Sequence, residues 1–258
     1  MGRFATTAEL YEQYRPPYSA EFFRAVAHGL TLSKQQALID LGTGPGLLAL
    51  GFAPYAGRVV GVDPEPEMLA AARGAAARAG ADVTFVEGRA EDLPQDIGGF
   101  DVVTIGRALH WMDPSALGPL FARLVAPGGA IVVCASFSVR GDRNPWLGDY
   151  DAARRNWSDS GLLVGADKGH QIHRNLPEVL GPAGFGVVET VSIETTHKVS
   201  AGDLARRVLT FSPSSPAALH DRVDAMLADI EARLLPFSRD GILAETLVSW
   251  ANVAQRRS

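Results

Sequence analysis

The chain has 258 residues, 47% of them hydrophobic and 21% charged, with a formal net charge of −5 and one cysteine. This composition is typical of a globular protein, and an acidic balance without a cluster of lysines and arginines argues against a nucleic-acid partner. No apolar run approaches the ~20 residues of a membrane span, and the first residues lack the apolar core of a secretory signal, so we expect a cytoplasmic protein with no membrane partner.

Two short helices are expected before the core, over Ala8–Tyr14 and Ala20–Leu30, with Pro16-Pro17 between them. Aromatic side chains recur in this segment at near-helical spacing, and most of them are expected to pack against the core. Residues 1–34 are therefore interpreted as a cap.

A strand that turns into a helix through a glycine-rich loop comes next. Ala37–Leu41 is an apolar run of strand length, Leu47–Tyr55 has a helical pattern, and the chain from Asp40 to Gly46 reads D-x-G-x-G-x-G. Such a turn presents bare N–H groups and the positive end of a helix dipole, and its glycines let a ligand approach closely. We expect this loop to hold a nucleoside-containing cofactor.

Two other kinds of glycine-rich site fit the spacing less well. A P-loop ends in Gly-Lys-Ser/Thr, but the sequence has no lysine between Lys34 and Lys168. A dinucleotide fingerprint reads G-x-G-x-x-G, but Leu47 stands at the third glycine position. Asp63 follows the next apolar run and can accept both hydroxyls of a ribose. NAD and S-adenosylmethionine share that diol, so Asp63 alone does not choose between them.

Strands and helices alternate through the rest of the core, at the spacing of a parallel sheet with helices on both faces. Expected strands are Arg58–Val62, Val83–Val86, Asp101–Ile105 and Ala130–Ala135, the last entered through a Pro127-Gly128-Gly129 turn. One expected helix has Pro64 near its first turn and runs to about Arg78, and another spans 114–125 behind an Asp113 N-cap.

The pattern changes after the fifth strand. Residues 136–181 are loosely patterned and rich in aromatics, as expected of a substrate lid. The elements expected beyond them are a strand at Gly186–Thr195, a helix at Gly202–Phe211, an amphipathic helix within 215–235 and a last strand at Glu245–Ala254. We expect one domain over 1–258, with a cap at 1–34, a cofactor-binding core at 35–135, the lid at 136–181 and a C-terminal part at 182–258 that completes the sheet.

Four motifs in order resemble those of class I S-adenosylmethionine-dependent methyltransferases and cover roughly residues 35–135. They are the D-x-G-x-G-x-G loop followed by Gly61-Val62-Asp63, the segment from Gly88 to Pro94, Phe100–Ile105, and the segment from Leu124 to Val133. The rest is similar to a looser small-molecule group that includes trans-aconitate methyltransferases, on Tyr14-Arg15-Pro16 and His110-Trp111. The resemblance implies a Rossmann-like α/β fold with a seven-stranded, mostly parallel sheet, its last strand antiparallel between the fifth and sixth, and a helical cap or lid.

The resemblance also implies S-adenosyl-L-methionine as cofactor, S-adenosyl-L-homocysteine as product and no metal. By this resemblance, the residues expected to bind the cofactor are Tyr14, Arg15, Gly42, Gly44, Gly46, Asp63, Pro64, Met68, Ala90, Glu91 and Arg107. Among them, Asp63 would take the ribose hydroxyls, while Ala90 and Glu91 would contact the adenine. Asp40 would either reach the methionine amine through water or brace the loop.

On the acceptor side, His110 is the candidate general base, because an unperturbed pKa near 6.5 suits proton removal at neutral pH. The alternative is that His110 and Trp111 only shape the floor of the pocket. The candidates for substrate binding are Tyr18, Trp111, Trp146, Tyr150, His170 and His173. His170 and His173 have no cysteine or carboxylate cluster beside them, which disfavours a metal site.

The expected function is methyl transfer to oxygen, nitrogen or carbon of a small organic molecule. Abundant Ala and Gly, and Arg favoured over Lys, indicate a GC-rich genome and suggest natural product biosynthesis. The alternatives are an enzyme that retains the cofactor while catalysing a cyclisation or rearrangement, and a non-catalytic protein that binds S-adenosylmethionine. An NAD-dependent oxidoreductase is opposed by Leu47. A homodimer is compatible with the sequence, which does not set the oligomeric state.

Overall fold

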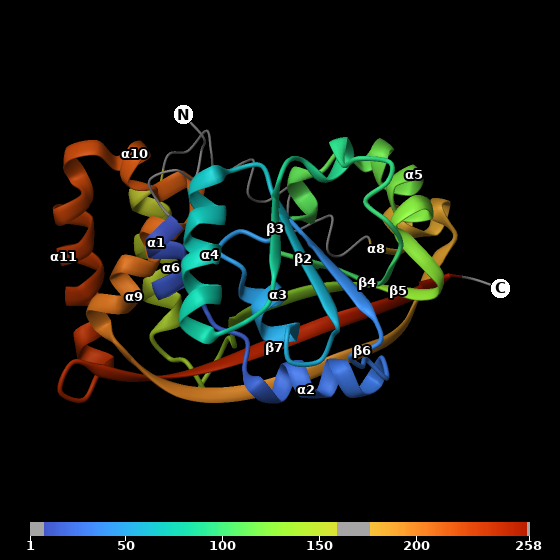
Figure 1. Cartoon of the computed structure of the whole chain (residues 1–258). Helices are drawn as coiled ribbons and strands as arrows, with labels where there is room; N and C mark the ends of the chain where they lie inside the picture. Colours follow the sequence, from blue (N-terminus) through green and yellow to red (C-terminus); the bar gives the residue numbers. More distant parts are fainter. Residues whose placement is uncertain (1–7, 159–175, 257–258) are drawn as a thin grey trace. The chain divides into compact units, whose positions relative to one another are not determined.

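The computed structural model describes residues 8–158 and 176–256 (Figure 1). These residues form two compact units. Unit 1 comprises residues 8–17, 136–158 and 194–248, and unit 2 comprises residues 18–135, 176–193 and 249–256. The expectation of a single domain with a cap and a lid stays a prediction.

The strands of the described residues form one seven-stranded sheet in the order β3-β2-β1-β4-β5-β7-β6. Their bounds are β1 Ala37–Leu41, β2 Arg58–Asp63, β3 Thr84–Glu87, β4 Phe100–Gly106, β5 Val125–Ser138, β6 Phe185–Ser200 and β7 Ile242–Arg256. The first five strands pair in parallel, with Ile39 opposite Val60 on one side and Val103 on the other. The position of β7 between β5 and β6 confirms the expected order, and the fold is Rossmann-like.

Unit 2 covers both faces of its strands, as the alternation of strand side chains requires. Ile39, Val103 and Ile131 pack on one face with the apolar side of α5, Pro114–Leu124. Their neighbours Leu38, Val102 and Val132 pack on the other face with α2, Ala20–Gly29, and α3, Leu47–Phe52. The expectation of helices on both faces is confirmed for this unit.

Most predicted boundaries in unit 2 are correct within two or three residues, and the helix that follows β2 begins two residues beyond Pro64. Helix α4 spans Pro66–Ala79 and has Glu65 as its N-cap, so Pro66, not Pro64, occupies its first turn. The cause is local: the Asp63 carboxylate accepts the N–H of Glu65 at 3.0 Å, and this two-residue turn delays the helix.

The predicted turn before strand five is present, but it lies inside the strand. Phe100 pairs with Val125 and Val102 pairs with Ala130, so residues 126–129 bulge between two paired positions. Gly128 has a φ of +80° within this bulge. Strand β5 therefore begins at Val125 rather than Ala130.

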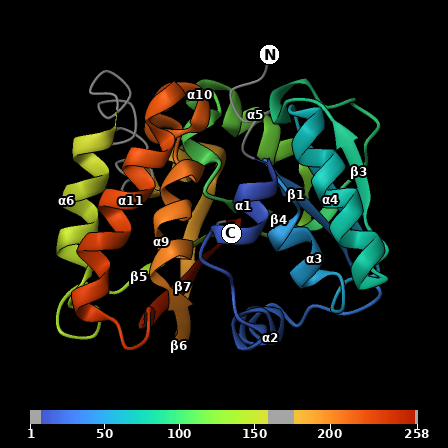
Figure 2. The same cartoon turned by 90° about the vertical axis from the view of Figure 1, so that its left-hand side faces the viewer.

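Unit 1 contains a helical layer in which α11, Val223–Leu234, packs against α6, Leu147–Trp157, and α9, Ala201–Arg207 (Figure 2). The amphipathic helix predicted within 215–235 is confirmed as α11, which buries Met226, Ile230 and Leu234. It begins only at Val223, because His220, at a φ of +53°, separates it from α10, Pro216–Leu219. The remaining short elements are α1 Ala8–Tyr14, α8 Leu176–Leu180, and the 3₁₀ turns Ala90–Asp92, Leu109–Trp111, Gly181–Ala183, Val208–Thr210, Ser212–Ser214, His220–Arg222 and Leu235–Phe237. None of the helices in the described part of the chain combines the length and the apolar character that crossing a membrane requires.

Candidate functional site

The glycine-rich loop at the carboxyl end of β1 has the conformation that its sequence predicts. Gly42, Gly44 and Gly46 have φ values of +67°, +55° and +88°, which favour glycine at all three positions. A Cβ at Gly42 would lie 2.4 Å from the Ala108 Cβ, so this glycine is also required by packing. A Cβ at Gly44 would meet nothing within 4 Å, so the loop leaves open space at its centre.

Asp63 at the end of β2 is tied to this loop. Its Oδ2 accepts the N–H of Gly44 at 2.8 Å and its Oδ1 accepts the N–H of Glu65 at 3.0 Å. Burial raises the pKa of Asp63, while these two hydrogen bonds lower it. A carboxylate offers about four lone-pair positions, so Asp63 retains acceptor capacity for ligand hydroxyls after bracing the loop.

Asp40 lies beneath the loop and braces it. Its Oδ2 accepts a hydrogen bond from Thr43 Oγ1 at 2.7 Å, and its Oδ1 accepts one from Thr104 Oγ1 at 2.8 Å. Burial raises the pKa of Asp40 to about 6, against the opposing effect of both threonine hydroxyls. Of the two predicted roles for Asp40, the observed contacts support bracing.

The carboxyl end of β4 brings Arg107 and Tyr18 together. Arg107 has a φ of +57°, a strained conformation for a non-glycine residue, and its guanidinium carbon lies 5.0 Å from the centroid of the Tyr18 ring. A Cβ at Gly106 would lie 2.6 Å from Leu48 Cδ1, so the backbone packs closely there. Strain of this kind at the ligand edge of a parallel sheet is typical of functional sites.

His110 and Trp111 follow in a 3₁₀ turn on the same edge of the sheet. Their ring centroids are 4.7 Å apart. Trp111 is 47% exposed, whereas its neighbour Leu109 is fully buried. An exposed indole beside an imidazole is a surface on which an organic molecule can pack.

The segment predicted to contact adenine already makes hydrogen bonds within the protein. Ala90 is buried. The Oε1 atom of Glu91 accepts the N–H of Asp113 at 2.9 Å and lies 3.4 Å from Arg89 Nη2. One carboxylate oxygen of Glu91 is thus used to hold the start of α5. Met68 is buried on α4, and Pro64 is exposed.

Four predicted site residues lie in unit 1. Arg15 Nη2 donates to the carbonyl of Thr210 at 2.8 Å, and the carbonyl of Tyr14 accepts from Arg207 Nε at 2.7 Å. Trp146 is 1% exposed, and its indole N–H donates to the carbonyl of Ala244 at 3.1 Å. Trp146 is thus part of the core of unit 1, and its role in substrate binding stays a prediction.

Tyr150, the fourth, is buried beside Trp146. Two further candidates, His170 and His173, lie outside the described residues.

The sequence interpretation missed a buried ion pair in unit 1. Glu245 is fully buried and accepts from Arg207 Nη1 at 2.6 Å and Nη2 at 2.8 Å. Ser138 Oγ donates to it at 2.6 Å, and His197 Nε2 lies 3.2 Å from Oε2. One feature of the sequence could have indicated this ion pair: Glu245 is the one charged residue in the run from Ile242 to Trp250.

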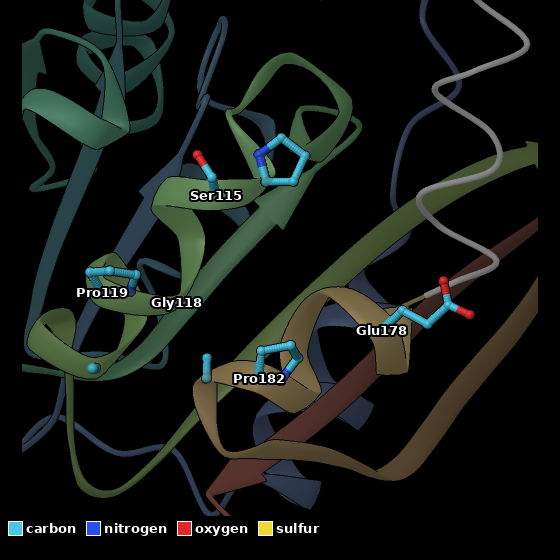
Figure 3. A pocket seen from close by; sticks show the side chains of 8 residues that line it. Ser115, Gly118, Pro119, Glu178 and Pro182 are labelled. Carbon is cyan, nitrogen blue, oxygen red and sulfur yellow. The ribbon is translucent and has the colours of Figure 1, made fainter.

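A surface hollow of about 560 Å³ lies in unit 2 between α5 and the turn at Gly181–Ala183 (Figure 3). Its labelled residues are Ser115, Gly118, Pro119, Glu178 and Pro182. None of the predicted site residues that the structure describes lines this hollow. The described residues contain no group of three or more His, Cys, Asp or Glu side chains arranged to hold a metal ion.

Comparison with known proteins places this geometry in context. Residues 38–129 match a family described as a methyltransferase domain. An uncharacterized methyltransferase from Mycobacterium tuberculosis is 29% identical over 231 residues, covering 87% of this chain and 85% of the relative. The demethylmenaquinone methyltransferase of Thermus thermophilus is 44% identical over 117 residues, covering 43% of this chain and 52% of the relative.

A solved structure supports the fold assignment. The S-adenosylmethionine-dependent methyltransferase of Geobacter sulfurreducens, in complex with S-adenosyl-L-homocysteine, superposes with a TM-score of 0.58 at 20% identity. The match covers 100% of this chain and 99% of that one. At this identity the similarity is one of fold.

Proposed function

The chain is a class I S-adenosylmethionine-dependent methyltransferase, and from this premise we propose that it methylates an oxygen, nitrogen or carbon atom of a small organic acceptor. The observation that carries the proposal is the loop of Gly42, Gly44 and Gly46, all with positive φ, tied to Asp63 through the Gly44 amide. A small acceptor is supported by the net charge of −5 and by the exposed Trp111.

The residues of unit 2 fit the cofactor. The open space at Gly44 admits a ligand next to the loop amides, and the acceptor capacity left on Asp63 suits the two ribose hydroxyls. We assign Ala90, Glu91 and Met68 to the adenine side and Arg107 to the methionine side. When bound, the cofactor supplies an electrophilic methyl group on a positively charged sulfur.

The chain's own residues then orient the acceptor, exclude water and manage one proton. Trp111 offers a flat apolar surface against which an acceptor can be held in line. His110 would accept the proton of a hydroxyl or an acidic carbon, a contribution typically worth 10²–10⁴-fold in rate. The 4.7 Å spacing of the two rings lets one acceptor contact both.

Calorimetric titration with S-adenosylmethionine and S-adenosyl-L-homocysteine tests the cofactor assignment. We expect binding by the wild-type protein and a loss of at least about tenfold in affinity for Asp63→Ala, because hydrogen bonds to a charged group contribute about 1.5–3 kcal/mol. Asp203→Ala, at a half-exposed position paired with Arg206 in unit 1, is the control and should bind normally. If the wild-type protein binds neither ligand, the cofactor assignment is wrong.

Consumption of the methyl donor tests the reaction. Across a panel of small alcohols, amines and acidic carbon compounds, we expect at least one acceptor to yield S-adenosyl-L-homocysteine. His110→Gln should then lower kcat by about 10²-fold without changing cofactor affinity. A rate unchanged in His110→Gln would leave His110 a pocket-shaping role. If the protein binds S-adenosylmethionine but no acceptor in the panel leads to its consumption, the two alternatives are favoured: an enzyme that retains the cofactor during a cyclisation or rearrangement, and a non-catalytic protein that binds it.

A further inference from the structure

Strand β6 forms one edge of the sheet, and one side of its backbone has no neighbouring strand among the described residues. It runs for 16 residues, whereas β3 at the opposite edge has only 4. A short edge strand offers little for another chain to pair with, but a long one presents a row of N–H and C=O groups that can accept a further strand. Of the two edges, β6 is therefore the one suited to pairing with another chain.

The N-terminal part of β6, residues 185–193, lies in unit 2 and exposes apolar side chains. Val187 is 38% exposed and Val188 is 61% exposed, the highest exposed fraction among the large apolar side chains that the structure describes. Successive residues of a strand point to opposite faces of the sheet, so this edge is apolar on both faces. Edge strands are commonly protected by lysine or proline, and residues 185–193 contain neither.

An open hollow of about 500 Å³ lies beside this edge, between α2 and β6 of unit 2 (Figure 1). The side chains that line it on the two elements include Glu21, Arg24 and His28 from α2 and Glu189, Val191 and Ile193 from β6. Val191 and Ile193 pack against the core of unit 2 but are only half-buried. Apolar surface therefore continues from the edge of the sheet into the hollow.

The charged side chains of the hollow are of both signs. Glu21, Arg24 and Glu189 are exposed, and none of them makes an ion pair within the part of the chain that the structure describes. A two-fold interface brings one patch of surface against a copy of itself, so each charge in the patch meets the charges of the same patch. Arg24 of one copy can therefore pair with the partner's Glu21, and the hollow is complementary in charge to itself.

We propose that two copies of this chain associate through β6, with residues 185–191 of each copy paired antiparallel across a two-fold axis at Val188. Val188 then lies opposite the partner's Val188, which places the most exposed apolar side chain at the centre of the contact. An axis at Glu189 would instead set two carboxylates directly opposite each other, which is unfavourable. The association goes beyond the proposed function and does not depend on it.

Sedimentation across a series of protein concentrations tests the association. We expect the wild-type protein to have twice the mass of one chain. Val188→Lys places two lysines opposite each other at the axis and should associate about tenfold more weakly, with an unchanged free energy of unfolding of the separate chain. The matched control is Ile242→Lys, at a position 41% exposed in unit 1, which should associate like the wild type.

A disulfide tests where the two strands meet. Residues directly opposite each other in an antiparallel pair have Cα atoms about 4.5–5.5 Å apart, within the range that a disulfide spans. Under mild oxidation, Val188→Cys should therefore form a covalent dimer that a reductant separates. The native Cys134 is fully buried and should not contribute. Ile242→Cys is the matched control and should remain a single chain on a denaturing gel.

Three results would each overturn the proposal. A wild-type protein with the mass of one chain at every concentration would show that no second copy occupies this edge. If the wild type is a dimer and Val188→Lys associates equally tightly, the two copies meet at another surface. If Val188→Cys forms a disulfide no faster than Ile242→Cys, the strands do not pair at Val188.

Discussion

The carboxylate of Asp63 accepts the backbone N–H of Gly44 at 2.8 Å, which joins the end of β2 to the centre of the glycine loop. Strands β1 and β2 are neighbours in the sheet, so this hydrogen bond spans their adjacent carboxyl ends. One side chain thereby holds the loop open and presents acceptor oxygens beside it. The loop and the aspartate are expected to act as a unit in ligand binding.

Gly44→Ala should separate folding from ligand binding. Its φ of +55° strains any other residue by about 1 kcal/mol, but its open surroundings permit the methyl group. That methyl group would fill the space a ligand needs, so affinity for S-adenosyl-L-homocysteine should fall at least tenfold by calorimetry. Gly80→Ala is the control, with a φ of +60° and equally open surroundings outside the loop. Equal affinities in the two variants would contradict the assigned site.

Arg107→Gly should stabilise the ligand-free protein and weaken its ligand binding. Glycine relieves the strain at a φ of +57°, which is worth about 1 kcal/mol, and removes the guanidinium next to Tyr18. Thr31→Gly relieves similar strain at a φ of +53° and should leave binding unchanged. Urea unfolding and calorimetry measure the two effects. If Arg107→Gly binds as tightly as Thr31→Gly, Arg107 has no role in the site.

Asp40 should make the protein less stable as the pH rises. Its pKa is raised from 3.8 to about 6 by burial, so its contribution is fully favourable below pH 3.8 and is lost as the pH rises through 6. The loss is about 3 kcal/mol at 1.36 kcal/mol for each pKa unit. Asp40→Asn cannot ionise and should flatten this part of the profile between pH 4 and pH 7 in urea unfolding. A profile identical to that of the wild type would mean that Asp40 has an ordinary pKa.

Glu245→Gln should destabilise the protein strongly. Burial alone would raise the pKa of Glu245, but hydrogen bonds from Arg207, His197 and Ser138 and the charge of Arg207 lower it to about 2. The stability from ionised Glu245 is therefore present above pH 4.5 and is lost as the pH falls toward 2. At pH 7 the substitution leaves Arg207 buried without its counter-charge, at a cost of about 3–5 kcal/mol.

The exposed pair of Arg143 and Glu194 provides the comparison for Glu245. Glu194→Gln should change the free energy of unfolding by less than about 1 kcal/mol. The double variant Arg207→Met/Glu245→Gln should recover part of the lost stability, since it removes the uncompensated charge. Equal effects at positions 194 and 245 would show that burial of the second pair contributes nothing.

The features predicted best from the sequence are those fixed by near neighbours in the chain. The glycine loop, the β1 strand and the Asp113 N-cap each depend on a few consecutive residues, and all three were predicted. The start of α4 two residues beyond Pro64 has an equally local cause, because the Asp63 side chain accepts the N–H of Glu65.

The buried cluster of unit 1 could not be predicted in this way. Arg207 and Glu245 are 38 residues apart, and the carbonyl of Tyr14 that accepts from Arg207 is 193 residues from it. Charge patterns along the chain do not report such pairings, because an exposed arginine and a buried one look alike in a sequence. Predicting Tyr150 as a site residue required only that it be aromatic; its unsatisfied hydroxyl emerges from the packing.

The order of the sheet also has a consequence for synthesis on the ribosome. Strand β7 lies between β5 and β6 but is translated after both of them. Until it emerges, β5 exposes an unpaired edge with the apolar sequence of a central strand, the kind of edge that pairs wrongly or aggregates. The sheet can therefore be completed only after β7 has been translated. A nascent chain that stalls before Ile242 should depend on chaperones to stay in solution.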